Sequence, residues 1–437
     1  MTFTIIIASI TAIAMICAVL IKPYATIKKF SIGLYWVVCL IGAILMLVFN
    51  RLSLSSAING ITAQTSVNPL KILTLFLSMT LLSVYLGDAG FFDFIAEKVF
   101  LKTKGSTFRL FIILYAVVSV LTIFTSNDII ILTFTPPICI FAKKAKISPL
   151  PFLFGEFVAA NTWSMMLIVG NPTNIYLAGS AGISFINYLS VMYLPALLGG
   201  LTGLISIILL FRKQLFRPLP QTDSTDCDAP LKTIKHKTLL IIAIAHLLLC
   251  IILLAVSDFI GFEMWAICLI LALSMTAFSL LYDIVVEKSV LPVLASLKKE
   301  PYELIPFVLS MFVIVLALRE CGATELLNKL LLTNTKTDGV IFGFLSAISA
   351  NLLNNIPMSV LFESIISNAS TPALYGTIIG SNVGAFITPV GALAGIMWNK
   401  ILARYGVKLS FIKFVLYGTI IAIPTLIASV GALMLTI

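Results

Sequence analysis

Long apolar stretches recur along the whole chain and are separated by short polar segments. Most of them are about 17 residues or longer, the length that a helix needs to cross the hydrocarbon core of a bilayer. The alternating short segments typical of a membrane β-barrel do not occur in the sequence. The pattern therefore predicts an all-α polytopic membrane protein. Uninterrupted spans are expected at residues 3–21, 32–50, 70–86, 188–211, 238–256, 264–282, 306–318 and 411–435.

Two further apolar segments are each divided by a polar tip. In residues 108–142 the tip is Thr125-Ser126-Asn127-Asp128, and in residues 339–366 it is Asn354-Asn355-Ile356-Pro357. Basic residues flank the first segment at both ends, which indicates that it enters and leaves the membrane on one side. A polar tip can lie at membrane depth where protein or water surrounds it. We therefore predict two re-entrant hairpins; two short spans joined by a polar turn are the alternative.

One stretch occurs twice, once in each half of the chain. Residues 151–170 read PFLFGEFVAANTWSMMLIVG and residues 372–391 read PALYGTIIGSNVGAFITPVG, so that Asn161 falls on Asn382 without a gap. Both copies end in residues that disfavour helix, Gly170-Asn171-Pro172-Thr173-Asn174 and Thr388-Pro389-Val390-Gly391. Paired interruptions of this kind point to the binding site of a transporter. We predict broken helices over residues 150–178 and 372–403; two ordinary spans with similar turn residues are the alternative.

The order of the segments also repeats. Each half is expected to run span, span, span, interfacial helix, hairpin, broken helix, span, and the interfacial helices are predicted at residues 87–100 and 319–332. Five crossings in each half place the halves in opposite orientations, which predicts ten transmembrane helices plus two re-entrant hairpins in two inverted repeats. Lys and Arg gather in the segments that are cytoplasmic if both termini lie outside. The predicted divisions are the first repeat at 1–212, a cytoplasmic linker at 213–237 and the second repeat at 238–437.

Composition narrows the class of function. Apolar residues make up 60% of the chain and charged residues only 11%, whereas soluble domains carry about a quarter charged residues. Basic cytoplasmic loops account for the net charge of +10, so no nucleic acid partner is expected. The seven cysteines have no metal-ligand or redox spacing, and no catalytic motif is present. We therefore expect neither a cofactor nor an enzyme; a membrane scaffold or enzyme without transport is the alternative from another class.

The four polar breaks are expected to meet near the middle of the membrane. Unwound backbone frees carbonyl and N–H groups for a ligand, and Asn and Thr side chains add donors and acceptors without a buried charge. Asp128 is the one ionisable residue in these breaks, and an intramembrane carboxylate is a candidate for function. Its alternative, shared with Asn127, is to cap a helix that begins at Ile129. Glu156 and Glu363 also have two interpretations, as proton carriers or as paired residues near the membrane boundary. His246 is either a ligand or an ordinary hydrogen-bonded residue of its span.

The motifs in these breaks resemble the ion transporter superfamily. In length and motif the chain is most similar to the arsenite and antimonite permeases of the ArsB type. The first tip departs from the Ser-Asn-Thr motif of the sodium-coupled dicarboxylate carriers, because Asp128 stands where they have Thr. The motifs that carry the resemblance are Ser126-Asn127-Asp128 with Leu132-Thr133-Phe134-Thr135-Pro136, then Gly170-Asn171-Pro172-Thr173-Asn174, then Gly380-Ser381-Asn382 with Thr388-Pro389-Val390-Gly391-Ala392-Leu393-Ala394.

The resemblance implies a secondary active transporter, most directly one for proton-coupled efflux of arsenite and antimonite as neutral trihydroxides. It implies a homodimer in the inner membrane with an elevator-like moving domain, and a soluble ATPase subunit as a further partner. A sodium-coupled anion or dicarboxylate transporter, or a sodium/proton antiporter, is the alternative within the superfamily. No Arg lies in the four breaks, which fits a neutral substrate.

The four breaks, together with the family motifs, predict a set of site residues. Asp128 would carry the proton, and a sodium ion, where one is used, would lie at Asn127, Gly170, Asn355 and Thr388. The residues implied for substrate or ion binding are Ser126, Asn127, Asp128, Asn171, Thr173, Asn174, Asn354, Asn355, Asn382, Thr388 and Gly391.

Overall fold

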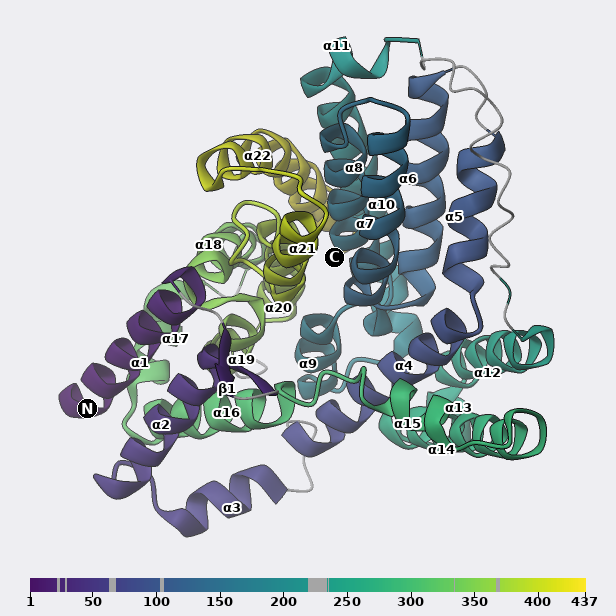
Figure 1. Cartoon of the computed structure of the whole chain (residues 1–437). Coiled ribbons are helices and arrows are strands. Elements are labelled where there is room, and N and C mark those ends of the chain that lie inside the picture. Colours follow the sequence, from purple (N-terminus) through teal and green to yellow (C-terminus); the bar gives the residue numbers. More distant parts are fainter. Residues whose placement is uncertain are drawn as a thin grey trace.

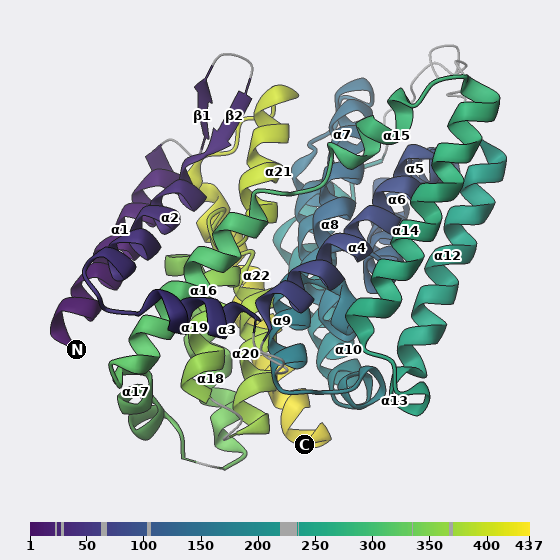
Figure 2. The same cartoon turned by 90° about the horizontal axis from the view of Figure 1, so that it is seen from below.

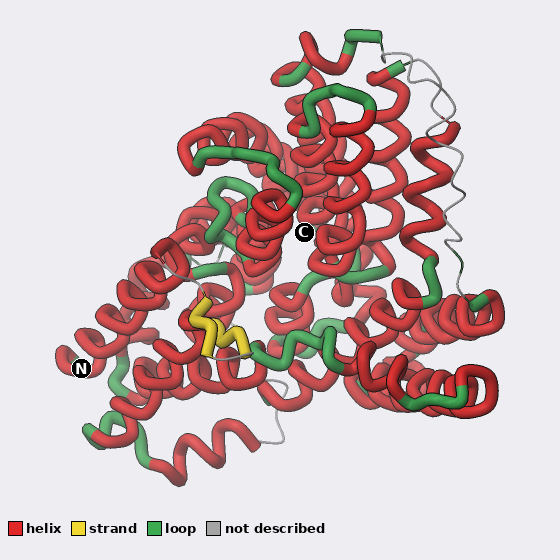
Figure 3. The backbone as a smooth tube through the Cα atoms, in the orientation of Figure 1, coloured by secondary structure: helices red, strands yellow, loops and turns green. Residues whose placement is uncertain are grey.

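Helices make up nearly all of the regular structure (Figure 3). The computed structural model describes residues 1–21, 24–27, 30–62, 68–102, 106–218, 234, 236–333, 335–366 and 370–437. The predicted helical class is confirmed, with one addition: β1 (Tyr24–Ile27) and β2 (Phe30–Gly33) form a short antiparallel hairpin. The span predicted from residue 32 therefore begins two residues later, as α2 (Leu34–Val48).

Six helices of the described chain are long and apolar enough to cross a membrane. A seventh span results if α16 (Leu304–Glu320) and α17 (Ala323–Leu331), which meet at a bend of 78°, are counted as one. The chain is thus a polytopic helical membrane protein, and the count of ten crossings with two re-entrant hairpins stays a prediction. The six are α4 (Pro69–Asp88), α6 (Thr107–Phe124), α10 (Phe185–Leu210), α12 (Lys237–Ala255), α14 with its continuation (Met264–Val286) and α22 (Phe411–Thr436).

Two groups of three helices form opposite ends of the molecule (Figures 1 and 2). In one group α1 (Thr2–Ile21) and α2 pack against α16; in the other α12 and α14 pack against α4. Each group therefore joins two helices of one half of the chain to a single helix of the other half. The two halves are interlocked rather than folded as separate units.

The interrupted segments pack against these end groups. The first half contributes α6, α7 (Asn127–Lys144), α8 (Leu150–Trp163) and α9 (Pro172–Ser180). The second half contributes α18 (Thr337–Leu353), α19 (Asn355–Ile366), α20 (Thr371–Gly384) and α21 (Leu393–Arg404). Helix α19 packs on α16, and α9 packs on α4. Helix α8 packs on α6, α20 packs on α18, and α10 packs along α22.

Glycine allows α18 and α20 to approach closely. A Cβ atom on Gly380 would overlap Ser346 Oγ and the Gly343 carbonyl oxygen, and it would lie 2.8 Å from Ala347 N. A Cβ atom on Gly376 would overlap Gly339 in the same way, one turn earlier. Small residues four apart on facing helices give this close contact in membranes. Helix α18 of the second hairpin and α20, the first arm of the second broken helix, therefore form one tightly packed unit.

The two helices predicted to lie in the interface begin at corresponding glycines. Gly90 (φ 88°) separates α4 from α5 (Phe91–Lys102), and Gly322 (φ 78°) separates α16 from α17. Both glycines adopt the left-handed backbone that ends a helix, which places each helix start four residues later than predicted. Most of the predicted linker lies outside the described residues. Four short helices were not predicted: α3 (Leu54–Thr62), α11 (Arg212–Leu215), α13 (Ser257–Ile260) and α15 (Leu291–Leu297).

Candidate functional site

The first broken helix is interrupted after Trp163. Two 3₁₀ turns, η1 (Ser164–Met166) and η2 (Ile168–Gly170), lead to α9. Gly170 is required at the break because a Cβ atom there would overlap the Ser164 carbonyl oxygen. Asn171 then caps α9: its Oδ1 accepts from the N–H of Thr173 at 3.1 Å. The interruption is therefore built from glycine geometry and an asparagine cap.

The second broken helix is interrupted between Gly384 and Leu393, and Asn351 of α18 holds the gap. Asn351 Oδ1 accepts from the backbone N–H of Thr388 at 2.9 Å and from its hydroxyl at 2.7 Å. Its Nδ2 donates to the Gly384 carbonyl at 2.9 Å. One side chain from α18 thus satisfies polar groups at the end of α20 and inside the break.

The two broken helices cross at Asn382. Its Nδ2 donates to Asn174 Oδ1 at 2.7 Å, and its Oδ1 accepts from Asn171 Nδ2 at 2.9 Å and from Ser164 Oγ at 3.2 Å. The hydroxyls of Thr173 and Ser381 are 3.0 Å apart beside this cluster. All six side chains are buried. The crossing therefore consists of neutral polar groups that are bonded mainly to each other.

The first hairpin tip presents a buried acceptor without a partner. Asn161 Nδ2 donates to the Phe157 carbonyl at 2.8 Å, so Asn161 Oδ1 faces Asn127 and accepts from its Nδ2 at 3.1 Å. These two bonds leave Asn127 Oδ1 pointing away from Asn161, buried and without a hydrogen bond to any described residue. The hydroxyl of Ser126 is buried and unpaired in the same sense. Neutral polar groups of this kind are costly to bury alone.

The alternative role predicted for Asn127 and Asp128, a helix cap, is wrong. Helix α7 begins at Asn127 rather than at Ile129, and the residue at the cap position is Ser126, whose side chain makes no capping bond. Asp128 lies in the first turn, half-buried, and it makes neither a hydrogen bond nor an ion pair with the residues that the structure describes. The positive end of the α7 dipole is the favourable neighbour of this carboxyl group.

The second hairpin tip has a strained backbone and a second unpaired acceptor. Asn354 adopts φ 72° and ψ 151°, a region that non-glycine residues rarely occupy. Its Nδ2 donates to the Val390 carbonyl at 3.0 Å, and the N–H of Asn355 donates to the Gly391 carbonyl at 3.0 Å. Asn355 Oδ1 is buried and has no hydrogen bond within the described chain. Both tips therefore leave an amide oxygen free.

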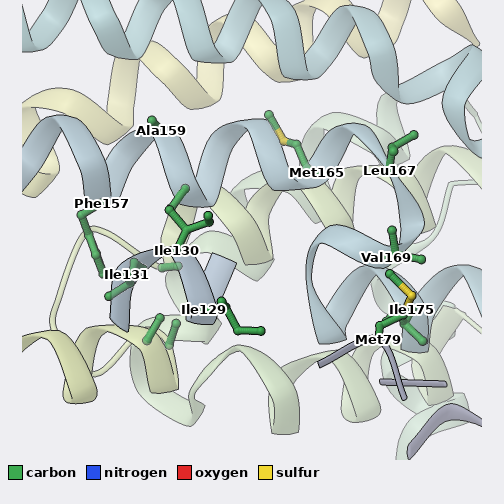
Figure 4. Close-up of a cluster of buried hydrophobic side chains, with 14 of the residues drawn as sticks. Met79, Ile129, Ile130, Ile131, Phe157, Ala159, Met165, Leu167, Val169 and Ile175 are labelled. Atoms are coloured by element: carbon green, nitrogen blue, oxygen red, sulfur yellow. The ribbon is translucent and has the colours of Figure 1, made fainter. Parts of the chain in front are cut away.

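The four breaks are joined in a ring that alternates between the halves. The first tip bonds to α8, and α9 beyond the first break packs against α19, where Ile356 shares a small cavity with Pro172 and Tyr176. The second tip bonds to the second break, and α21 beyond it packs against α7. Figure 4 shows the apolar packing around one part of the ring, with Ile130 and Ile131 beside the helix of Phe157 and Ala159. That the polar groups enclose one binding volume stays a prediction.

Several polar residues of these breaks were not among the predicted site residues. They are Asn161, Ser164, Asn351 and Ser381. The repeat held a signal for one of them, because Asn161 aligns with Asn382. Among the ambiguous residues, His246 is satisfied by the Ile242 carbonyl at 2.8 Å and Ser274 Oγ at 3.1 Å. Glu363 is half-buried on α19, near Arg319.

An open cavity of about 540 Å³ lies beside the second arm of the first broken helix. Ile175 and Gly179 of α9 form part of its wall, opposite Lys71 and Glu263. Lys71 Nζ lies 2.6 Å from the Glu263 carboxylate, which also accepts from the indole N–H of Trp265. These two hydrogen bonds lower the pKa of Glu263, the Lys71 bond most strongly. The wall of the cavity therefore contains an ion pair near α9, and this pair has no net charge.

Comparison with known proteins identifies the family. The family model described as CitMHS, citrate transporter, matches residues 34–373, which is more than half of the chain. The chain belongs to the CitMHS family. It is also 27% identical to the "Arsenical pump membrane protein" of Escherichia coli (strain K12), over 82% of this chain and 85% of that protein. The "Putative arsenical pump membrane protein" of Bacillus subtilis (strain 168) is 24% identical, over 80% and 83% respectively.

A solved transporter shares the fold of this CitMHS chain. The YdaH transporter of Alcanivorax borkumensis superposes with a TM-score of 0.58 at 13% sequence identity, covering 99% of this chain and 97% of that one. These similarities confirm the predicted resemblance to the ion transporter superfamily and to ArsB-type permeases. The CitMHS chain is therefore a membrane transporter of the ArsB/CitMHS type.

Proposed function

We propose that the chain exports arsenite and antimonite as neutral trihydroxides, coupled to protons, and that the four breaks form its binding site. The observation that carries this proposal is the pair of free amide oxygens, Asn127 Oδ1 and Asn355 Oδ1, one on each hairpin tip. An unpaired buried acceptor costs about 1–3 kcal/mol, so a ligand that donates hydrogen bonds stabilises both tips. As(OH)₃ and Sb(OH)₃ carry hydroxyl donors and no charge.

The same oxygens argue against a carboxylate substrate such as citrate. A carboxylate accepts hydrogen bonds and needs cationic or N–H donors around it. The breaks at residues 125–128, 170–174, 354–357 and 388–391 contain no Lys or Arg. The side-chain donors of Asn171 and Asn382 are already used at the helix crossing. A neutral donor ligand is the better match to this set of groups.

A sodium-coupled transporter or sodium/proton antiporter is the second candidate, because the same observation favours it. Free amide and carbonyl oxygens are also the groups that bind a hard cation. The proposed sodium position is formed by Asn127, Gly170, Asn355 and Thr388. In this candidate the free oxygens hold the coupling ion rather than the substrate.

Asp128 is proposed as the proton carrier. It is adjacent to Asn127 and lacks a cationic partner among the described residues. A carboxyl group at membrane depth is neutral when protonated and charged when it has released its proton, so the two forms differ in the cost of exposure to the low dielectric. Arsenite bound at Asn127 would therefore be next to the group that changes charge.

The remaining parts of the proposal concern the assembly. Ser126, Asp128, Thr173, Asn174, Asn354 and Gly391 are proposed to complete the site. We place the protein in the inner membrane with both termini outside, as a homodimer whose interrupted helices move in an elevator-like step relative to the end groups α1–α2–α16 and α4–α12–α14. A soluble ATPase subunit is a further proposed partner.

The test uses a host that lacks its own arsenite exporter. Cells with the protein are expected to survive higher arsenite, and everted vesicles with an imposed proton gradient should accumulate arsenite without sodium. Asp128→Asn should abolish accumulation, whereas Glu325→Gln, which changes an exposed carboxylate on α17, should leave it intact. If cells with the protein are as sensitive to arsenite as cells without it, the proposed substrate is wrong. If transport in vesicles strictly requires sodium, the second candidate is favoured.

The orientation is tested separately by thiol labelling in intact cells. Cysteines placed at Ser53 and Lys213, both exposed, are expected to react from outside and from the cytoplasm respectively, in a background without the native cysteines. Reaction of both residues from the same side would overturn the proposed topology.

A further inference from the structure

A second carboxyl group lies deep in the interrupted-helix region, away from Asp128. Glu156 of α8 is fully buried, and no Lys, Arg or His of the described chain lies within salt-bridge distance of it. Its partner is a hydroxyl: Thr135 Oγ1 of α7 lies 2.8 Å from Oε1 and 3.1 Å from Oε2. A buried carboxylate with a single neutral partner would be strongly destabilising, which favours the protonated form of Glu156.

The hydrogen bonds of Thr135 decide which atom carries the proton. Thr135 Oγ1 also lies 2.6 Å from the Ile131 carbonyl oxygen, which can only accept. A hydroxyl has a single hydrogen to donate, and the shorter contact with the carbonyl takes it. The contact between Thr135 and Glu156 then needs a hydrogen from Glu156. The arrangement is satisfied when Glu156 is a neutral carboxylic acid that donates to Thr135.

The surroundings also provide a donor for the ionised form. Trp398 of α21 is fully buried beside Glu156, and its indole N–H has no hydrogen-bond partner at bonding distance within the described residues. Its ring packs against Phe157 and Phe154 of α8, with centroid distances of 5.1 and 5.9 Å. A small movement of α21 toward α8 would bring this N–H to the carboxylate. The two protonation states of Glu156 therefore favour different contacts between α7, α8 and α21.

Other ionisable groups lie on the helices that pack around α8. Cys139 of α7 lies close enough to Glu156 to interact with it electrostatically. No basic residue on the described parts of these helices forms an ion pair with the carboxyl group. The ionisable residues on the elements packed around it are Asp128, Lys143 and Lys144 on α7, Arg109 and Tyr115 on α6, Tyr188 and Tyr193 on α10, Tyr375 on α20, Lys400 and Arg404 on α21, and Lys413 and Tyr417 on α22.

We propose that Glu156 is a second proton site of the transporter. In this structure it is the neutral acid that donates to Thr135; on release, its proton passes to water in the transport pathway and the carboxylate accepts hydrogen bonds from Trp398 and Thr135. Because Trp398 belongs to the second half of the chain and Thr135 to the first hairpin, the proton changes how the two halves pack. The inference rests on the proposed proton-coupled transport and adds a proton site to it.

The experiment follows the carboxyl group directly by infrared spectroscopy of the full-length protein in vesicles. The wild type should show the C=O stretching band of a buried neutral acid that disappears as the pH is raised, and Glu156→Gln should lack that band. Trp398→Phe, which keeps an aromatic ring at this position and removes the N–H, should make the band persist to higher pH. Glu325→Gln is the matched control and should retain the wild-type band. An unchanged band in Glu156→Gln would overturn the proposal.

Transport measurements give the second readout. Glu156→Gln should still bind arsenite, supplied as its sodium salt, but lose the proton movement that accompanies arsenite transport. Thr135→Val, which lacks the hydroxyl, should impair this proton movement. Thr135→Ser, which keeps the hydroxyl, should retain it. If wild-type vesicles move arsenite without protons, the proposed function fails; if they move both and Glu156→Gln does the same, only the present inference fails. Should Glu156→Gln not fold, an infrared band unaltered by both Trp398→Phe and Thr135→Val would overturn it.

Discussion

Asn382 donates a hydrogen bond of 2.7 Å to Asn174, although 208 positions separate the two residues in the chain. Asn382 also accepts from Asn171 and Ser164, so one side chain of the second half joins three residues of the first break. All of these groups are buried and neutral. The broken helices α8–α9 and α20 are therefore expected to move as one body during transport.

Replacing Asn382 should loosen this crossing. Asn382→Ala leaves Asn174 Oδ1 and Asn171 Nδ2 without their partners, and each unsatisfied buried group costs about 1–3 kcal/mol. We expect a markedly lower Tm of the purified protein in detergent. Asn187→Ala, at an exposed position at the start of α10, is the matched control and should leave Tm unchanged. A wild-type Tm for Asn382→Ala would mean that the crossing does not stabilise the fold.

Replacing either free amide at the hairpin tips should weaken binding. Asn127→Ala and Asn355→Ala remove the acceptors that the proposed ligand uses, and a loss of about 1.4 kcal/mol corresponds to a tenfold rise in Kd. Binding of arsenite to the purified protein measures this effect, with Asn187→Ala as the control. If arsenite binds equally well to both variants, the free oxygens have another role, and sodium binding to the same variants would be measured next.

The close contact between α18 and α20 should not tolerate a methyl group. Gly380→Ala places a Cβ atom against Ser346 Oγ and the backbone of α18, and overpacking of this kind typically costs about 1–3 kcal/mol or more. We expect a reduced yield of monodisperse protein and a lower Tm. Gly431→Ala in α22 meets nothing within 4 Å and should be neutral or slightly stabilising. Equal stability of the two variants would contradict the tight packing.

Glu300, outside the spanning segments between α15 and α16, should make stability depend on pH. Both carboxylate oxygens are buried without a hydrogen-bond partner in the described chain, and burial raises the pKa of Glu300 from 4.5 to about 8. The folded protein therefore holds this proton more tightly than the unfolded chain does. The contribution to the free energy of unfolding is fully present below pH 4.5 and is lost as the pH rises through about 8.

Glu300→Gln removes the group that titrates and keeps its shape. The variant is expected to be more stable than the wild type at about pH 9, by an order of a few kcal/mol, and similar to it at about pH 5. Tm measured across this range checks the sign, with Glu325→Gln as the control that should follow the wild type. A wild-type slope in Glu300→Gln would show that another group causes the pH dependence.

The sequence by itself determined the helical membrane class, the four breaks and most of their polar residues. These features are local: a long apolar run must be helical in lipid, and glycine, proline and asparagine interrupt a helix wherever they occur. Gly170 and Asn171 could be recognised for this reason without a fold. The family resemblance could be found in the same way, because its motifs are contiguous in the chain.

Only the tertiary structure decided which polar groups are free. Asn127 and Asn161 look equally available in the sequence, but the bond of Asn161 to the Phe157 carbonyl orients it toward Asn127, and this leaves Asn127 Oδ1 as the unpaired atom. The sequence also did not reveal that each end group combines helices from both halves of the chain, or that Glu156 pairs with Thr135. Both features depend on contacts between distant segments. A hydrogen bond has two partners, and the sequence states the chemistry of each but not the distance between them.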